Sequence, residues 1–197
     1  AKRNPDWKEP WKSLCTNGQN KMLDFRENNN TEIISCSQSC INDFTEYFGE
    51  KYTKFKIHKL LHTSSCNSEL KKTKFNTENP VILGNWDYGK KGKHIVDKLT
   101  NISSKFRYLE LNVKPANGNI KKFIQDKQQV YLNSDLFLQI SNSEGNSYAT
   151  LDALACGIPV IATNVGLFQC DKDIPQDCYV RIDLDKRLLT GYFKDNG

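Results

Sequence analysis

The half of the chain after Pro80 alternates short apolar runs with segments of helical periodicity, and this alternation restricts the fold more than any other feature. Short runs that predict strands lie at 81–83, 106–113, 136–140, 159–162 and 180–184. Segments that predict helices lie at 91–100, 117–126 and 148–156, and one more helix is expected after 184. This alternation predicts an α/β fold, with a Rossmann-like parallel sheet and helices on both faces.

The first part of the chain follows a less regular pattern. The elements expected there are a helix at 19–27, a strand at 31–35, a helix at 38–48 and a strand at 55–58. Ser37 is a typical N-cap for the second helix, and Gly49 is a typical residue to end it. Residues 63–80 are polar, lack periodicity and contain several turn-forming residues, so they read as a linker. We therefore expect two domains, at 1–79 and 80–197.

Ligands of parallel sheets bind beyond the carboxyl ends of the strands, and the loop after Ile140 offers the functional groups for such a site. Glu144 comes directly before a glycine, where the backbone can approach a ligand closely. Backbone N–H groups near 146–149, at the expected helix start, suit a phosphate or a sugar hydroxyl. Asp152 lies one turn further, so both carboxylates can accept hydrogen bonds from one ligand. Alternatively, they merely favour the positive end of a helix.

A longer stretch around these carboxylates carries a family resemblance. Residues 144–166 read Glu-Gly-Asn-Ser-Tyr-Ala-Thr-Leu-Asp-Ala-Leu-Ala-Cys-Gly-Ile-Pro-Val-Ile-Ala-Thr-Asn-Val-Gly. They resemble the Glu-x7-Glu signature of family 4 retaining glycosyltransferases, which continues through a small-Cys-Gly-x-Pro-Val stretch to an Asn/Asp-x-Gly turn. The resemblance covers 31–185 but is dense only at 142–166. It implies a GT-B fold, in which 80–197 is the nucleotide-sugar-binding half and 1–79 contains the tail of the N-terminal acceptor domain.

The resemblance also implies roles for individual residues. Glu144 should contact the sugar of the donor, and Asp152 the ribose hydroxyls. The stretch 81–92 is similar to the family's first strand and phosphate-binding loop, in which Lys91 falls on a lysine that would hold the diphosphate and offset leaving-group charge. The other residues expected to bind the donor are Asn85, Gly145, Asn146, Ser147 and Tyr148.

Two positions depart from the family pattern. Asp152 stands where the family has glutamate, which shortens the reach of the carboxylate by one methylene, on the order of 1.5 Å. Asn85 stands where the family usually has arginine, so one of two phosphate-binding cations is missing. Both departures leave open a member with weakened activity or none.

The function implied is transfer of a sugar from a UDP- or GDP-linked donor to a hydroxyl group, with retention of configuration and with no metal or other cofactor required. The acceptor would be a glycan, a lipid or a protein, held largely by the N-terminal domain. The partners expected for the chain itself are a missing N-terminal domain or further copies of the chain in a homo-oligomer. The alternative is a non-catalytic nucleotide-sugar-binding module, or an inactive fragment, that works with a partner chain. A nucleotide-sugar epimerase would need further acid/base residues, which the sequence does not offer.

Charge argues against nucleic acid as a partner. The net charge is only +5, from 28 Lys and Arg against 23 Asp and Glu, and the two signs are interspersed. The densest basic cluster, at 71–74, is too short for a nucleic-acid-binding stripe. The Asp-x-Asp pairs at 171–173 and 183–185 are weak metal candidates, and the three histidines have no zinc-like spacing.

The seven cysteines include no Cys-x-x-Cys pair, which favours reduced thiols in a cytoplasmic protein, with attachment to a membrane surface left open. No apolar run is long enough to predict a transmembrane segment in this chain. The chain begins at Ala1 and its only methionine is Met22, so we expect it to be a piece of a longer product.

Overall fold

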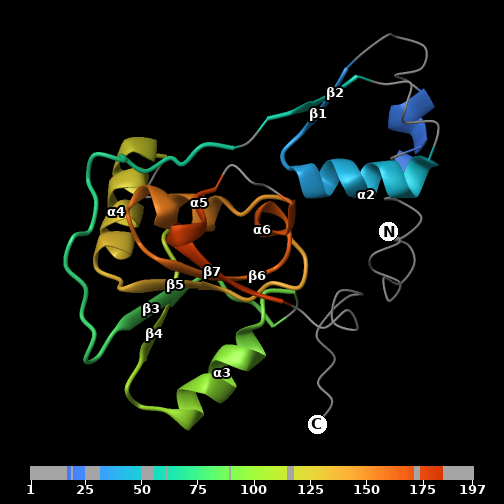
Figure 1. Cartoon of the computed structure of the whole chain (residues 1–197). Helices are drawn as coiled ribbons and strands as arrows, with labels where there is room; N and C mark the ends of the chain where they lie inside the picture. Colours follow the sequence, from blue (N-terminus) through green and yellow to red (C-terminus); the bar gives the residue numbers. More distant parts are fainter. Residues whose placement is uncertain are drawn as a thin grey trace.

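The computed structural model describes residues 17–18, 20–24, 32–49, 56–60, 62–88, 90–114, 118–170 and 174–183. Within these residues, five parallel strands form the central sheet in the order β4-β3-β5-β6-β7 (Figure 1). The strands are β3 (Val81–Gly84), β4 (Arg107–Glu110), β5 (Leu136–Gln139), β6 (Val160–Thr163) and β7 (Tyr179–Ile182). The predicted Rossmann-like parallel sheet is therefore confirmed.

Helices cover both faces of the sheet, also as predicted (Figure 1). One face carries α3 (Lys93–Ile102), and the other carries α4 (Ile120–Leu132), α5 (Tyr148–Ala155) and α6 (Leu167–Cys170). Side chains alternate along β3, so Ile82 belongs to the core under α3 while Leu83 belongs to the core under α4 and α5. The same alternation on β5 places Phe137 and Leu138 in opposite layers.

Several bounds differ from those expected. α4 was expected at 117–126 but runs to Leu132, since Gln128 and Tyr131 near its end are buried. The strand expected at 106–113 is only Arg107–Glu110, because β4 pairs with the four residues of β3 alone. The short α6 and a 3-10 helix at Gln176–Cys178 were not expected. The helix expected after 184 lies outside the described residues.

The N-terminal unit consists of β1 (Ile33–Ser35), α2 (Gln38–Phe48) and β2 (Ile57–Lys59), in which the two strands pair in parallel. The predicted caps of α2 are confirmed, since the Ser37 side chain accepts a hydrogen bond from Cys40 N and Gly49 ends the helix. The strand expected at 55–58 begins two residues later. Within the helix expected at 19–27, residues 20–24 are helical.

Residues 62–80, here called the connecting segment, contain no helix or strand among the positions that the structure describes. The segment is nevertheless fastened to the sheet domain. Lys72 N donates to Cys156 O over 2.9 Å, and Asn67 N donates to the Gln128 side chain over 3.2 Å. A segment held in this way can contribute side chains to a site on the domain.

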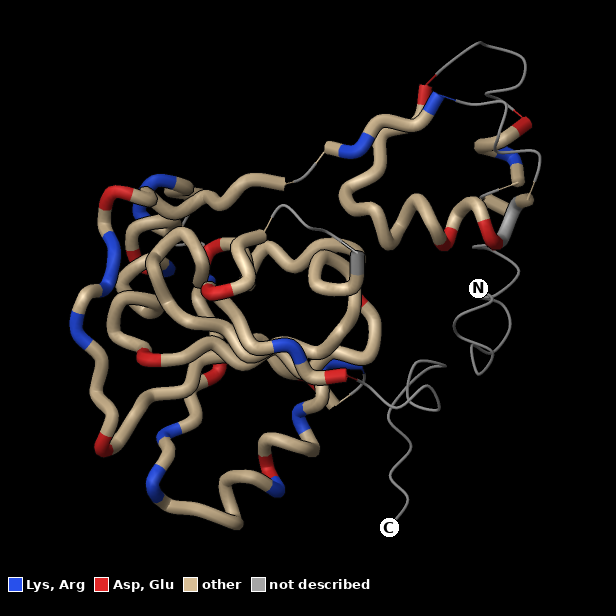
Figure 2. The backbone as a smooth tube through the Cα atoms, viewed as in Figure 1, with Lys and Arg blue, Asp and Glu red and all other residues tan. Residues whose placement is uncertain are grey.

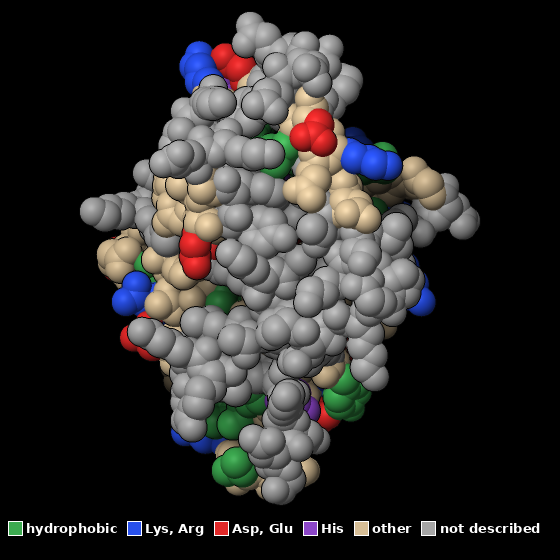
Figure 3. All heavy atoms as spheres, turned by 90° about the vertical axis from the view of Figure 1, so that its right-hand side faces the viewer, with side chains coloured by type: hydrophobic (Ala, Val, Ile, Leu, Met, Phe, Trp, Pro, Cys, Tyr) green, Lys and Arg blue, Asp and Glu red, His purple; other side chains and the backbone are tan. Residues whose placement is uncertain are grey.

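Positions of both charge signs are interspersed along the described backbone (Figure 2). The face seen in Figure 3 likewise mixes charged, polar and apolar side chains where they are described. Among the described residues, no helix is both long enough and apolar enough to cross a membrane.

Candidate functional site

The strand order places a topological switch point between β3 and β5. From β3 the chain crosses to its neighbour β4 on one side, and it then returns to β5 on the other. Sheets of this order bind ligands at the switch point, beyond the carboxyl ends of these two strands, so the loops that follow β3 and β5 are the expected ligand contacts. These two loops carry Lys91 and Glu144, the residues expected to bind the diphosphate and the sugar.

The two loops are in direct contact. Asn142 N donates to Lys90 O over 2.9 Å, which ties the loop of Glu144 to the loop of Lys91. Gly92, the N-cap of α3, lies so close to the end of β5 that a Cβ there would be 2.8 Å from Ile140 O. The backbone at the switch point is thus closely packed, and it brings the two loops to one edge of the sheet.

The Glu144 side chain is partly buried and has a fixed partner. Ser141 Oγ donates to Glu144 Oε1 over 2.9 Å, which orients the carboxylate while leaving its other oxygen available for a ligand. The backbone is supported from the next strand, because a Cβ on Gly166 would lie 2.7 Å from Glu144 O. The Asn-x-Gly turn recognised in the sequence therefore has a packing role beside the loop.

The start of α5 provides the remaining expected donor contacts. Ser147 caps the helix, since its Oγ accepts a hydrogen bond from Thr150 N over 3.3 Å. Tyr148 is 57% exposed at the first helical position. Asn146 Nδ2 instead donates to Cys36 O over 3.2 Å, which joins the loop to the turn before α2. The N-terminal unit thus forms part of the wall of the candidate site.

Asp152 is placed differently from Glu144. Its carboxylate is only 3% exposed and points to the connecting segment and to α4. Oδ1 accepts hydrogen bonds from Ser64 Oγ at 2.7 Å and from Ser65 N at 3.0 Å, and Oδ2 forms an ion pair with Lys127 Nζ at 2.7 Å. We expected both carboxylates to be open to one ligand. In this structure the carboxylate of Asp152 is instead covered by residues of the chain.

The sequence did not predict these partners of Asp152. Ser64 and Ser65 lie in a polar segment that reads as a linker, and they are separated from Asp152 by 88 and 87 positions. Lys127 lies among other polar residues of α4. No local spacing signals contacts over such distances along the chain. The proposed contact of Asp152 with ribose stays a prediction.

The two residues expected to bind phosphate in the loop after β3, Lys91 and Asn85, differ in burial. Lys91 is partly buried, and its backbone N donates to Asp87 Oδ1 over 3.2 Å. Asn85, the replacement for the family's arginine, is exposed. A neutral amide at this position attracts phosphate less than a guanidinium would.

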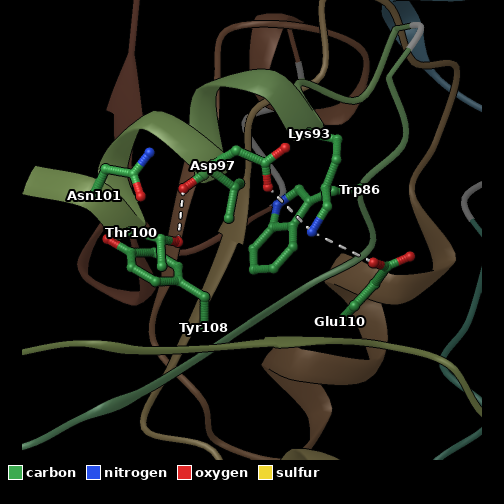
Figure 4. Close-up of a pocket in the computed structure, with 8 residues that line it drawn as sticks. Trp86, Lys93, Asp97, Thr100, Asn101, Tyr108 and Glu110 are labelled. Carbon is green, nitrogen blue, oxygen red and sulfur yellow. Dashed lines mark hydrogen bonds and ion pairs between the residues drawn. The ribbon is translucent and has the colours of Figure 1, made fainter. Parts of the chain in front are cut away.

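A hollow of about 410 Å³ lies on the other face of the sheet, between α3 and β4 (Figure 4). Lys93 Nζ lies 3.4 Å from Asp97 and 3.7 Å from Glu110, so the charges there are largely paired. The hydrogen bond from Tyr88 to Asp97 raises the pKa of that phenol. None of the residues expected at the donor site lines this hollow, which is lined by Trp86, Lys93, Val96, Asp97, Thr100, Asn101, Tyr108 and Glu110.

The described thiols form no disulfide. Cys36, Cys40, Cys66, Cys156 and Cys178 are free cysteines among the described residues. Burial raises the pKa of Cys40, whose Sγ lies 3.8 Å from Cys36 Sγ. Among the described positions, no three His, Cys, Asp or Glu side chains cluster as metal ligands would.

The aspartate pair at 171–173 lies outside the described residues, as does the second member of the pair at 183–185. Asp183 itself accepts a hydrogen bond from Asn164 Nδ2 over 3.0 Å.

Comparison with known proteins found one matching family. The family model of glycosyl transferases group 1 matches residues 94–180, which include the loop of Glu144 and all of α5. No curated protein matches the chain in sequence.

Two solved structures share the fold. Sucrose-phosphate synthase from Thermosynechococcus elongatus is 16% identical with a TM-score of 0.54, over 80% of this chain and 46% of that one. A chain of the GtfA/B complex is 14% identical with a TM-score of 0.55, over 83% of this chain and 37% of that one. The chain thus spans less than half the length of either protein. Residues 94–180 thus match the model of the glycosyl transferases group 1 family, and the α/β fold of the chain matches part of both solved structures.

Proposed function

We propose that this chain binds a nucleoside-diphosphate sugar at the switch point between β3 and β5. Together with an acceptor-binding half, it would transfer the sugar to a hydroxyl group with retention of configuration. The observation that supports the proposal most directly is the contact between the loops of Lys91 and Glu144, joined by the hydrogen bond from Asn142 N to Lys90 O. A cation and a carboxylate on adjoining loops suit the two ends of such a donor.

Each group has a distinct part in the proposed reaction. The Lys91 ammonium would bind the diphosphate and stabilise the charge that develops on it as the bond to the sugar breaks. The first backbone N–H groups of α5 have no partner within the helix and would bind the same phosphates. Glu144, oriented by Ser141, would accept hydrogen bonds from the sugar and hold its reacting carbon toward the acceptor.

Calorimetric titration of the chain with UDP, GDP and ADP tests the donor site. Saturable binding of one nucleotide is expected, and Lys91→Met should weaken it about 10-fold, because a charge-assisted phosphate contact is lost. Lys90→Met is the matched control, since Lys90 is the neighbouring lysine and is exposed. Equal losses in both variants, or a folded chain that binds none of the three nucleotides, would refute the proposed site.

Glu144→Gln tests the sugar end of the same site. The variant should bind the nucleotide as the unchanged chain does, but it should lose the added affinity of the nucleotide sugar over the nucleotide. Glu110→Gln serves as control, because Glu110 ends the neighbouring strand β4 and contacts only Lys93 among the partners described. Equal behaviour of the two variants would remove Glu144 from the sugar contact.

A second candidate is a non-catalytic nucleotide-sugar-binding module that works with a partner chain. It is favoured by Asn85, which supplies no charge, and by Asp152, whose carboxylate is occupied by the chain's own donors. One of the similar structures is itself described as a complex. Nucleotide binding without transfer to any hydroxyl acceptor, in the presence of the full partner assembly, would support this second candidate.

A further inference from the structure

Part of the connecting segment lies along the exposed side of α5. The His62 ring stacks on the Tyr148 ring with centroids 4.4 Å apart and planes 9° from parallel. Asp152 lies four positions after Tyr148 in the helix, and it accepts hydrogen bonds from Ser64 and Ser65. Residues four apart lie on the same side of a helix, so one stretch of chain covers both Tyr148 and Asp152.

The groups that cover this side of α5 have the chemistry of a nucleoside. A flat aromatic heterocycle lies on Tyr148, as a nucleobase would, and two hydroxyl groups lie at Asp152, as the 2′ and 3′ hydroxyls of ribose would. Ser64 Oγ lies 2.7 Å from Asp152 Oδ1 and Ser65 Oγ lies 3.3 Å from the same atom. Hydroxyls of a ribose could replace both serine hydroxyls like for like, whereas the hydrogen bond from Ser65 N to the same atom would be lost.

Lys127 completes this arrangement without belonging to the connecting segment. Its Nζ lies 2.7 Å from Asp152 Oδ2 and 2.6 Å from Ser65 Oγ. If the serines withdrew, the ion pair would remain, so Asp152 would not become an unpaired buried charge. The carboxylate is therefore prepared for an exchange of its hydroxyl partners.

His62 is the least satisfied part of the covering stretch. Its Nδ1 is buried without a hydrogen-bond partner among the described residues. A buried polar atom without a partner lowers stability, and withdrawal of the ring into water would restore its hydrogen bond. The stack on Tyr148 is thus a contact that a ligand with a larger aromatic surface could replace.

We propose that residues 62–65 occupy the nucleoside end of the donor site in the ligand-free chain and are displaced when a nucleotide binds. The nucleobase would stack on Tyr148, and the ribose hydroxyls would take the place of Ser64 and Ser65 at Asp152. This inference rests on the proposed function, since it concerns the same donor. It adds the base-binding surface and a competing segment of the chain itself.

The test compares UDP and GDP with inorganic pyrophosphate, which has the diphosphate but no nucleoside. The variant His62→Ala/Ser64→Ala/Ser65→Ala should bind the preferred nucleotide about 10-fold more tightly than the unchanged chain, because no segment competes. Its affinity for pyrophosphate should be unchanged. Thr63→Ala is the matched control, as Thr63 is an exposed residue of the same stretch.

A second pair of variants probes the aromatic surface independently of the connecting segment. Tyr148→Ala should weaken nucleotide binding about 10-fold without affecting pyrophosphate, whereas Tyr148→Phe should retain it, because stacking needs only the ring. Because Tyr148 is an exposed residue, both variants should keep the fold.

The outcomes separate the inference from the proposed function. If the unchanged chain binds a nucleotide, but the triple variant binds it no more tightly or Tyr148→Ala binds it equally well, residues 62–65 do not occupy a nucleoside site and only the inference fails. If neither the unchanged chain nor the folded triple variant binds any nucleotide, both fail. A gain in the Thr63→Ala control as large as in the triple variant would likewise overturn the inference.

Discussion

Replacement of Gly166 by alanine tests whether the turn after β6 sets the conformation of the Glu144 loop. Gly166 has a φ of +56°, which a residue with a side chain rarely adopts. A Cβ there would lie 2.7 Å from Glu144 O, closer than such atoms approach in proteins, and 3.0 Å from Gly145 O, which is a tight contact. Gly166→Ala must therefore move either its own turn or the loop.

The magnitude follows from these two effects. The left-handed backbone costs alanine about 1 kcal/mol, and relief of the overlap in a packed region adds about 1–3 kcal/mol. We expect the free energy of unfolding in urea to fall by about 3 kcal/mol in total. The affinity for a nucleotide sugar should fall as well. A shift of the Glu144 carboxylate lengthens or misaligns its hydrogen bonds to the sugar, and hydrogen bonds weaken steeply when their geometry departs from the favoured range.

Gly118→Ala separates the two effects. Gly118 has a φ of +75°, but a Cβ there would meet nothing within 4 Å. Its substitution should therefore lower the free energy of unfolding by only about 1 kcal/mol and leave binding unchanged. If Gly166→Ala is no more destabilising than Gly118→Ala and binds donor normally, the Gly166 turn does not support the Glu144 loop.

Three further substitutions test contacts that position the site. Asp135→Asn should destabilise by about 2 kcal/mol in urea unfolding, since it breaks a largely buried ion pair of 2.8 Å with Lys72. Burial alone would raise the pKa of Asp135, but hydrogen bonds from Lys72, Val81 and Asn76 outweigh it and lower the pKa. Stability from this group is hence present above its unfolded pKa and is lost as pH falls below about 4, and Asp135→Asn should reduce that loss. Tyr131→Phe, which removes a hydrogen bond of 2.9 Å to Ala149 O, should lower the unfolding free energy by about 1 kcal/mol, whereas no change would mean that the bond contributes nothing. Ser37→Ala should lower it by a similar amount, about 1 kcal/mol, through loss of the α2 cap, and an unchanged unfolding free energy would mean that the cap contributes nothing.

The parts of the fold that the sequence predicted well have strong local signals. α2 lies between Ser37 and Gly49 as expected, because a hydroxyl cap and a glycine with positive φ act within one turn of the helix. α5 was expected at 148–156 and is Tyr148–Ala155, since Ser147 begins it and Gly157 follows its end. Short-range chemistry was sufficient to place the loop of the candidate site.

The parts that the sequence missed depend on contacts between distant residues. α4 contains mostly polar residues, and its extension to Leu132 depends on Tyr131, whose ring packs near Phe137 of the sheet. The connecting segment read as a linker, although Lys72 and Asn76 both bond to Asp135. A polar segment without periodicity gives no signal of where its hydrogen-bond partners lie.

The loop at Glu144 and Gly145 depends on both parts of the chain. From the sheet domain, Gly166 packs against its carbonyl groups. From the N-terminal unit, a Cβ on Gly145 would lie 3.4 Å from Cys40 Sγ and 3.5 Å from Cys36 Sγ, so the turn before α2 is in contact with the loop. In the proposed reaction the N-terminal side would hold the acceptor. The residue expected to hold the sugar therefore lies beside the contact between the two parts of the chain, next to the side on which the acceptor would be held.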